Sequence, residues 1–377
     1  MGPLKGLRVI EVQGLGPAPF CGMLLADMGA EVISITRVSN SGSVAGTEQI
    51  SERGKRSVAL DLKSPKGVEL FLKLCEGADA LIEGFRPGVA ERLGIGPEQV
   101  QTRNPKLVYG RMTGWGQDGS LAQAAGHDIN YISLSGALHA IGRNGERPVP
   151  PLNLVGDFGG GGMFLAFGVM CAVFEAQRSG HGQVVDTSMV EGSAVLMTMM
   201  YSFFSAGGWK DERGSNMLDG AAHFYDTYET RDGKYVSIGS IEPQFYQLLM
   251  EKTGLRAEDL GDQRDPANWP KAKAKLTEIF RQKTRDEWCE IMEGSDVCFA
   301  PVLSMTEAPQ HPHNKERQSF IEIDGVVQPA PAPRFSRSAP EVSHPPRTPG
   351  ADTADVFSGL GFSADELNAL REQGVLG

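Results

Sequence analysis

The segment 126–133 reads Gly-His-Asp-Ile-Asn-Tyr-Ile-Ser and places a histidine directly before a predicted helix. Free N–H groups and partial positive charge at a helix N-terminus lower the pKa of a neighbouring imidazole. His127 can therefore stay neutral near pH 7 and act as a general base. Asp128 can cap the helix, or its backbone N–H can face a developing oxyanion. The alternative for His127 is a histidine that only hydrogen-bonds within a loop.

The segment 153–163 places a carboxylate, Asp157, before four consecutive glycines that lead into an apolar helix. Glycines let a ligand approach the backbone closely, and exposed amides at such a turn favour anions. Asp157 is therefore either the N-cap of the helix or a functional acid beside a bound ligand. These residues alone leave both interpretations open.

Glu242 lies where a predicted strand runs into a predicted helix, directly before Pro243. Proline suits the first turn of a helix. Taken alone, Glu242 is therefore interpreted as an acidic residue at the helix start rather than as a catalytic group.

Basic residues lie near the ends of the predicted strands. Arg37 ends the second strand, the run Arg53-Gly54-Lys55-Arg56 precedes the third, and Arg86 follows the fourth. In doubly wound folds the carboxyl ends of the strands form the ligand crevice. Cations gathered there in a chain of net charge −11 suit phosphate groups. Ordinary solvated surface charge is the alternative.

The elements that must position these residues alternate between strands and helices over the first half of the chain. Strands are predicted at 7–12, 30–35, 57–62, 79–82, 106–112 and 184–188, and helices at 17–29, 65–76, 129–141, 160–178 and 191–206. Such alternation predicts βαβ units and a mostly parallel, Rossmann-like α/β sheet.

A second, smaller α+β domain is predicted after an interruption at 213–222. A hairpin is predicted at 225–228 and 235–238, followed by two helices and a strand at 297–303. The Pro-rich tract 328–349 predicts an extended connector, and a last helix at 365–373 has Ser363 as its N-cap. The predicted domains are 1–190 joined by 335–377, a linker helix 191–224, a small domain 225–310 and a return linker 311–334.

The composition excludes several classes of protein. The net charge of −11 disfavours nucleic acids and anionic membranes as partners, and no run of about 18 apolar residues predicts a membrane span. Five scattered cysteines argue against a disulfide framework and a zinc site, so we predict no metal and a cytoplasmic protein. Gly14 and Gly16 begin a dinucleotide pattern, but Pro17 and Pro19 break it and disfavour a nicotinamide cofactor.

Together these segments resemble the α-methylacyl-CoA racemases, members of the class III CoA-transferase superfamily. The resemblance runs along nearly the whole chain. It includes 6–11, 82–88, 112–117, 126–133, the Asp157 glycine run, 241–246 and 332–336. The aspartate before the glycines marks the superfamily broadly, whereas Gly-His-Asp-Ile-Asn-Tyr is specific to the racemase branch.

The resemblance implies a CoA thioester as substrate, an interlocked homodimer, and no metal, flavin or nicotinamide. It implies that CoA lies along the large domain. The implied CoA-binding residues are Arg37, Lys55, Ala59, Leu60, Arg86 and Tyr131. The active site is expected where one chain's large domain meets its partner's small domain.

The resemblance also implies catalytic roles for His127 and Asp157. They are expected to move the Cα proton of a 2-methylacyl-CoA between opposite faces, one as base and the other as acid. The backbone N–H of Asp128 would bind the enolate oxygen, and Glu242 of the partner subunit would orient His127. Met197, Met199, Met200 and Met217 are candidates for an adaptable acyl surface, although such a stripe also suits an ordinary core.

Two other functions remain open at this point. In a CoA-transferase, Asp157 would attack the acyl-CoA as a nucleophile and form a mixed anhydride. A non-catalytic acyl-CoA-binding protein would leave the Cα proton in place.

Overall fold

The computed structural model describes residues 2–40 and 50–377, which form two compact units. Unit 1 comprises the chain up to Ser135, Leu152–Leu196 and Phe320–Gly377. Unit 2 comprises Gly136–Pro151 and Met197–Ser319. The predicted domains had different bounds: they assigned 136–151 to the large domain and treated 191–224 as one linker.

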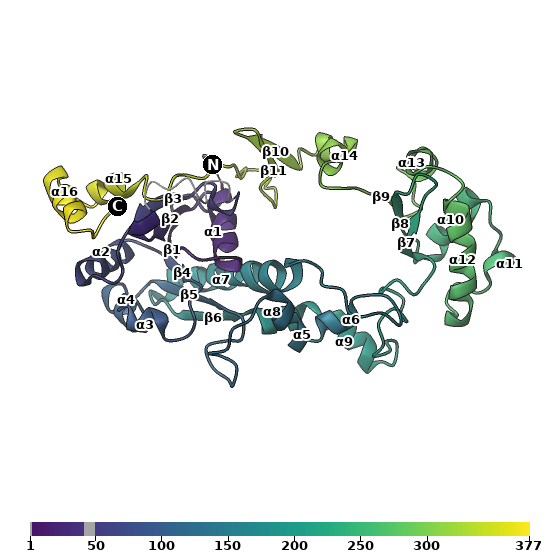
Figure 1. Cartoon of the computed structure of the whole chain (residues 1–377), viewed down its shortest axis with the longest axis horizontal. Coiled ribbons are helices and arrows are strands. Elements are labelled where there is room, and N and C mark those ends of the chain that lie inside the picture. Colours follow the sequence, from purple (N-terminus) through teal and green to yellow (C-terminus); the bar gives the residue numbers. More distant parts are fainter. Residues whose placement is uncertain (1, 41–49) are drawn as a thin grey trace. The chain divides into compact units, whose positions relative to one another are not determined.

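Unit 1 is built on six parallel strands in the order β3-β2-β1-β4-β5-β6, which confirms the predicted fold class (Figure 1). The strands are β1 Arg8–Val12, β2 Glu31–Thr36, β3 Arg56–Ala59, β4 Ala80–Glu83, β5 Val108–Thr113 and β6 Val184–Ser188. The strand order reverses between β1 and β4. In open α/β sheets the ligand crevice lies outside the carboxyl ends of the strands at this reversal.

Both faces of the sheet are covered because alternate residues of each strand point to opposite sides. In β1, Val9 packs with α1 (Pro17–Asp27) and α7 (Phe164–Ser179), whereas Ile10 and Val12 pack on the other face. That other face is covered by α2 (Pro65–Cys75), α4 (Pro97–Arg103), α15 (Thr353–Gly359) and α16 (Ala364–Glu372). The short α3 (Val89–Arg92) follows β4, and Ser363 caps α16 as predicted.

Two helices predicted as continuous are each broken where the chain passes between the units. The predicted helix 129–141 is α5 (Asp128–Leu134) followed by α6 (Ala137–Ala140), with Gly136 at φ 84° between them. The predicted helix 191–206 is α8 (Met189–Leu196) followed by α9 (Thr198–Ser205). The apolar periodicity continues through both breaks. Gly136 lies at the first break, whereas the sequence contains no comparable signal at the second.

The glycine run lies in a π-helical segment, Leu154–Met163, that leads into α7. Its glycines are packed against other elements. An added Cβ would meet the backbone of Ser193 at Gly160, Pro17 and Met189 at Gly161, and Phe20 at Gly162. The prediction that these glycines make room for a ligand is therefore wrong for these three, which let α1 and α8 approach the segment.

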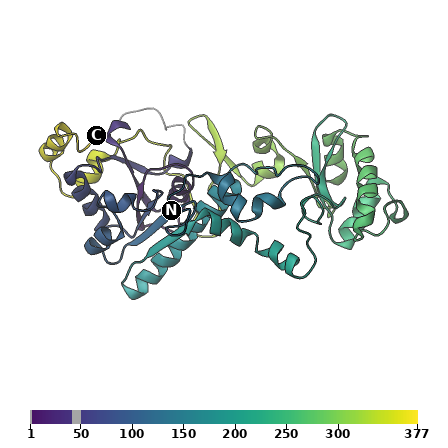
Figure 2. The ribbon, with the colours of Figure 1, turned by 60° about the horizontal axis from the view of Figure 1, so that its bottom comes forward.

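Leu154–Ser179 is the one helix in the described part of the chain that is long and apolar enough to cross a membrane. The core helix of a folded domain meets the same criteria of length and composition. Leu165, Val169 and Val173 of this helix are buried in the core beside the sheet, and Figure 2 shows the helix in teal running along unit 1.

Unit 2 contains the predicted hairpin, β7 (Tyr225–Glu229) with β8 (Tyr235–Gly239), extended by β9 (Phe299–Val302). Its core joins this sheet to α10 (Pro243–Thr253), α12 (Trp269–Phe280) and α13 (Arg285–Met292), and Figure 2 shows these helices in green. The remaining elements are α11 (Ala257–Leu260) and α14 (Pro312–Glu316) in unit 2, and the hairpin β10 (Phe320–Ile323) with β11 (Val326–Pro329) in unit 1.

Candidate functional site

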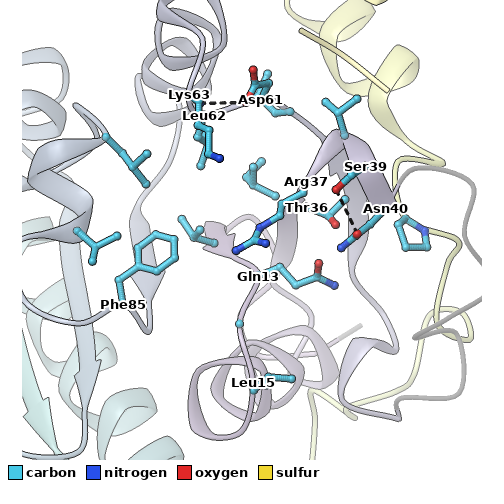
Figure 3. A pocket seen from close by; sticks show the side chains of 18 of the residues that line it. Gln13, Leu15, Thr36, Arg37, Ser39, Asn40, Asp61, Leu62, Lys63 and Phe85 are labelled. Atoms are coloured by element: carbon cyan, nitrogen blue, oxygen red, sulfur yellow. Dashed lines mark hydrogen bonds between the residues drawn. The ribbon is translucent and has the colours of Figure 1, made fainter. Parts of the chain in front are cut away.

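A cavity of about 1040 Å³ lies at the carboxyl ends of β1 to β4 in unit 1. Gln13 follows β1, Arg37 follows β2, Leu60 follows β3 and Phe85 follows β4. Figure 3 shows the Arg37 guanidinium extending into the space that Gln13 and Phe85 border. We refer to this space as the first cavity; its position is the one that the strand order predicts for a ligand.

Two of the predicted CoA-binding residues, Arg37 and Leu60, line the first cavity. Ala59 is not among the lining residues. Its N–H donates to the Thr353 hydroxyl at 3.0 Å and its carbonyl accepts from the N–H of Gly377 at 3.2 Å. Both backbone groups are thus used within the fold, and a contact of Ala59 with CoA stays a prediction.

Lys55 also does not line the first cavity. Its ammonium lies 2.8 Å from Glu11 and donates to the Pro19 carbonyl at 3.0 Å, and the residue is 2% exposed. Neighbouring Arg53 pairs with Asp27 at 2.6 Å, so these two cations neutralise buried carboxylates. The cation that the sequence interpretation missed is Lys63, an exposed residue that lines the first cavity (Figure 3).

A second cavity of about 540 Å³ opens beside the first, where the loops after β1, β4 and β5 meet α5 and the π-helical segment. His127, Asp157, Arg86 and Tyr131 all line it. Leu15 and Phe85 line both cavities, so the two spaces share a wall. The structure thus brings the histidine, the carboxylate and two predicted CoA-binding residues together within unit 1.

Asp157 lies inside the π-helical segment, which excludes the N-cap interpretation. One carboxylate oxygen accepts a hydrogen bond from the Asn153 amide at 3.2 Å. The Asp157 N–H donates to the Asp128 carboxylate at 2.7 Å. Burial raises the pKa of Asp157, the Asp128 charge adds to that increase, and Asn153 and His127 oppose it. The net increase brings the pKa of Asp157 closer to the range in which a carboxyl can both donate and accept a proton.

His127 occupies the N-cap position of α5 and is exposed in this chain. Its backbone N–H donates to the Asn130 side-chain oxygen at 3.0 Å. α5 has only seven residues. Its dipole is therefore smaller than that of the longer helix predicted at 129–141. Asp128 does not cap the helix with its side chain. As the first residue of α5, it has a backbone N–H with no acceptor within the helix.

The Tyr131 ring lines the second cavity and fits there because two neighbouring residues are glycines. An added Cβ would come within 2.0 Å of its ring at Gly114 and 2.7 Å at Gly126. Its hydroxyl donates to the Gly126 carbonyl, and its ring packs edge-on to Trp115 at 4.8 Å. Tyr131 therefore supports the segment that carries His127, and its hydroxyl is already used there.

Glu242 belongs to unit 2, whereas His127 and Asp157 belong to unit 1. It is the exposed N-cap of α10, with Pro243 following as the sequence predicted. Its role beside His127 stays a prediction. In the described residues, no three His, Cys, Asp or Glu side chains group as they would around a metal ion.

Comparisons with known proteins place this site in a family. A CaiB/BaiF family protein from Brucella suis superposes with a TM-score of 0.82 at 25% identity, over 95% of this chain and 99% of that one. Residues 4–353 match CoA-transferase family III, and the chain belongs to that family.

Within the family, the chain is similar to two racemases. It is 49% identical to the alpha-methylacyl-CoA racemase of Mus musculus, over 99% of this chain and 97% of the relative. It is 45% identical to the alpha-methylacyl-CoA racemase of Homo sapiens over the same shares of the two chains.

Proposed function

We propose that the protein is an isomerase that interconverts the (2R) and (2S) epimers of 2-methylacyl-CoA thioesters. The observation that carries this proposal is a histidine and a protonation-prone carboxyl in one cavity. A CoA-transferase of this family needs the carboxylate but not the histidine. The similarity to two racemases along nearly the full chain favours the same function.

The reaction requires one group to remove the Cα proton and another to return a proton to the opposite face. In one direction, neutral His127 takes the Cα proton and the C–H electrons move into the thioester as an enolate. Protonated Asp157 then donates its proton to the other face of Cα. The enzyme is left with an imidazolium and a carboxylate, from which the reverse conversion begins.

The enolate oxygen needs a donor that is already in place. The backbone N–H of Asp128 is proposed for this role, because it is unused within α5 and lies in the segment that carries His127. Loss of a comparable oxyanion donor typically costs on the order of 100-fold or more in rate.

A homodimer is part of the proposal. Phe167 and Phe174 are 69% and 61% exposed on α7, and Val195 and Leu196 are exposed on α8. Large apolar side chains exposed together favour an interface. In the dimer, Glu242 of the partner subunit would orient His127. Light scattering that gives the mass of one chain would overturn the proposed homodimer.

A cytoplasmic location is also proposed, and subcellular fractionation tests it.

The CoA nucleotide is proposed to occupy the first cavity and the acyl end the second. We expect Arg37→Met and Lys63→Met each to weaken CoA binding by on the order of 10-fold, because each removes a charged phosphate contact. Calorimetric titration with CoA measures the effect, and salt should reduce it. Lys66→Met is the matched control, since Lys66 is exposed but does not line the cavity. Unchanged affinity in both variants would place CoA elsewhere.

The function is tested by incubating the protein with one epimer of 2-methyldecanoyl-CoA in deuterated water. We expect proton NMR to show loss of the Cα proton together with formation of both epimers, with no CoA transferred to an added carboxylic acid. CoA transfer with the Cα proton retained would instead make Asp157 the nucleophile of a transferase. Binding with neither reaction would indicate a non-catalytic protein.

A further inference from the structure

The Asp128 side chain connects the two segments that carry the candidate catalytic groups. Asp128 is the first residue of α5, directly after His127, and its Oδ2 accepts the Asp157 N–H at 2.7 Å. The residue is 7% exposed. Gly156 is adapted to this contact, because a Cβ there would come within 2.5 Å of the same oxygen. The Asp128 carboxylate therefore binds the backbone N–H of a residue 29 positions later in the sequence. The absence of a side chain at Gly156 leaves room for this contact.

The Asp128 carboxylate differs from the other buried acids of unit 1. Glu11 faces Lys55 at 2.8 Å and Glu83 faces Arg111 at 3.1 Å. Among the residues that the structure describes, no cation pairs with Asp128, and its Oδ1 is buried without a hydrogen-bond partner. Its negative charge is therefore uncompensated where it meets Asp157.

The groups around Asp157 come from several elements. α5 contributes His127, Asp128 and Tyr131, the loop after β4 contributes Arg86, and the π-helical segment contributes Asn153. From the turn before α1, Gly16 is so close that its Cβ would lie 3.4 Å from the Asp157 carboxylate. Of these groups, Asp128 is the one whose charge adds to the pKa increase of Asp157 that burial causes.

We propose that the Asp128 carboxylate is a positioning residue that fixes the Asp157 backbone beside His127 and strengthens the hold of the Asp157 carboxyl on its proton. This role is separate from that of the Asp128 backbone N–H. It rests on the proposed function, because holding a proton on Asp157 matters only when Asp157 donates one. A purely structural role for Asp128 would stabilise the two segments without affecting where Asp157 titrates.

Asp128→Asn separates the two roles. The side-chain carbonyl oxygen of the introduced asparagine can still accept the Asp157 N–H, so this variant keeps the shape and removes the charge. Asp118→Asn is the control, because it removes one exposed negative charge from the loop after β5. Asp128→Ala removes the hydrogen bond as well, and its thermal unfolding reports the structural contribution.

The Asp157 carboxyl is followed by carbon-13 NMR in protein labelled at aspartate, with Asp157→Asn used to assign its signal. We expect Asp128→Asn to shift the midpoint of Asp157 to lower pH, because it removes a negative charge that raises the pKa of Asp157. In the direction in which Asp157 donates, the alkaline limb of kcat/KM should move to lower pH as well, because a proton donor loses activity as the pH rises through its pKa. Asp118→Asn should move neither.

An unchanged Asp157 midpoint in folded Asp128→Asn would overturn the inference, even if activity falls. The NMR titration needs no substrate, so it is independent of the proposed reaction. If the midpoint shifts but the wild-type protein exchanges no Cα proton, the proposed function fails while the electrostatic effect of Asp128 stands. A shifted midpoint with an unmoved kinetic limb would show that Asp157 is not the proton donor, and would overturn the role proposed here.

Discussion

Replacing Asp157 with asparagine is expected to lower the rate of epimer interconversion by on the order of 10²–10⁴-fold. The remaining base, His127, can still form the enolate from the epimer whose proton faces it. The proton then returns from the same side. In deuterated water, Asp157→Asn should therefore exchange the Cα proton of one epimer without inverting it.

His127→Asn should give the mirror result, with exchange of the other epimer through Asp157. Proton NMR and separation of the epimers measure exchange and inversion independently, and Asp118→Asn serves as control. Loss of exchange for both epimers in both folded variants would contradict a two-base reaction. Inversion at the wild-type rate in either variant would remove that residue from the chemistry.

Lys55→Met is expected to lower the free energy of unfolding by about 3–5 kcal/mol, because it leaves the carboxylate of Glu11 buried without its cation. Glu11 and Lys55 are 0% and 2% exposed. Burial raises the pKa of Glu11 to about 8 and Lys55 opposes the increase, so the loss of Lys55 should raise that pKa further and make Glu11 take up a proton more readily on folding. The deficit should therefore shrink as the pH falls toward the usual range of a free glutamate, where the unfolded chain is protonated too.

Urea denaturation at several pH values measures this loss. Adding Glu11→Gln to Lys55→Met should restore much of the stability, because the fully buried carboxylate of Glu11 is then removed with its cation. Only Glu52, whose side chain is 11% exposed and lies 3.4 Å from Lys55 in the wild type, loses a partner. The folded double variant should bind CoA like the wild type, in contrast to Arg37→Met. Weakened CoA binding by the stable double variant would return Lys55 to the ligand site.

The positions and parallel type of the strands could be predicted because parallel strands, buried on both faces, read as short apolar runs between helices. Their order in the sheet was not predicted. The helix breaks at Gly136 and Met197 were not predicted. They separate two apolar helices whose periodicity continues across the break. The first helix of each pair ends where the chain passes from unit 1 to unit 2, and this boundary is set by tertiary packing.

The site was predicted unevenly for a related reason. His127 and Asp157 stand in segments with unusual local chemistry, and the fold brings both to one cavity. Lys55 and Lys63 are the same residue type near the same strand, and only the folded structure shows which of them is buried and which lines the cavity. Glu11, at the centre of β1, supplies the buried charge that retains Lys55, while Lys63 extends beyond β3 into the first cavity. A charged residue in the middle of a buried strand was the available signal that Lys55 has a partner inside.

The discontinuity of unit 1 has a consequence for synthesis of the chain on the ribosome. Pro349 and Gly374 line the first cavity, and Phe357 and Leu370 fill the core beneath it. These residues are translated only after Met197–Ser319, most of unit 2, has been made. A nascent chain therefore carries the complete sequence of unit 2 while the first cavity of unit 1 still lacks part of its wall. Capacity to hold CoA should emerge late in translation, and unit 2 must avoid misfolding before any ligand is able to help.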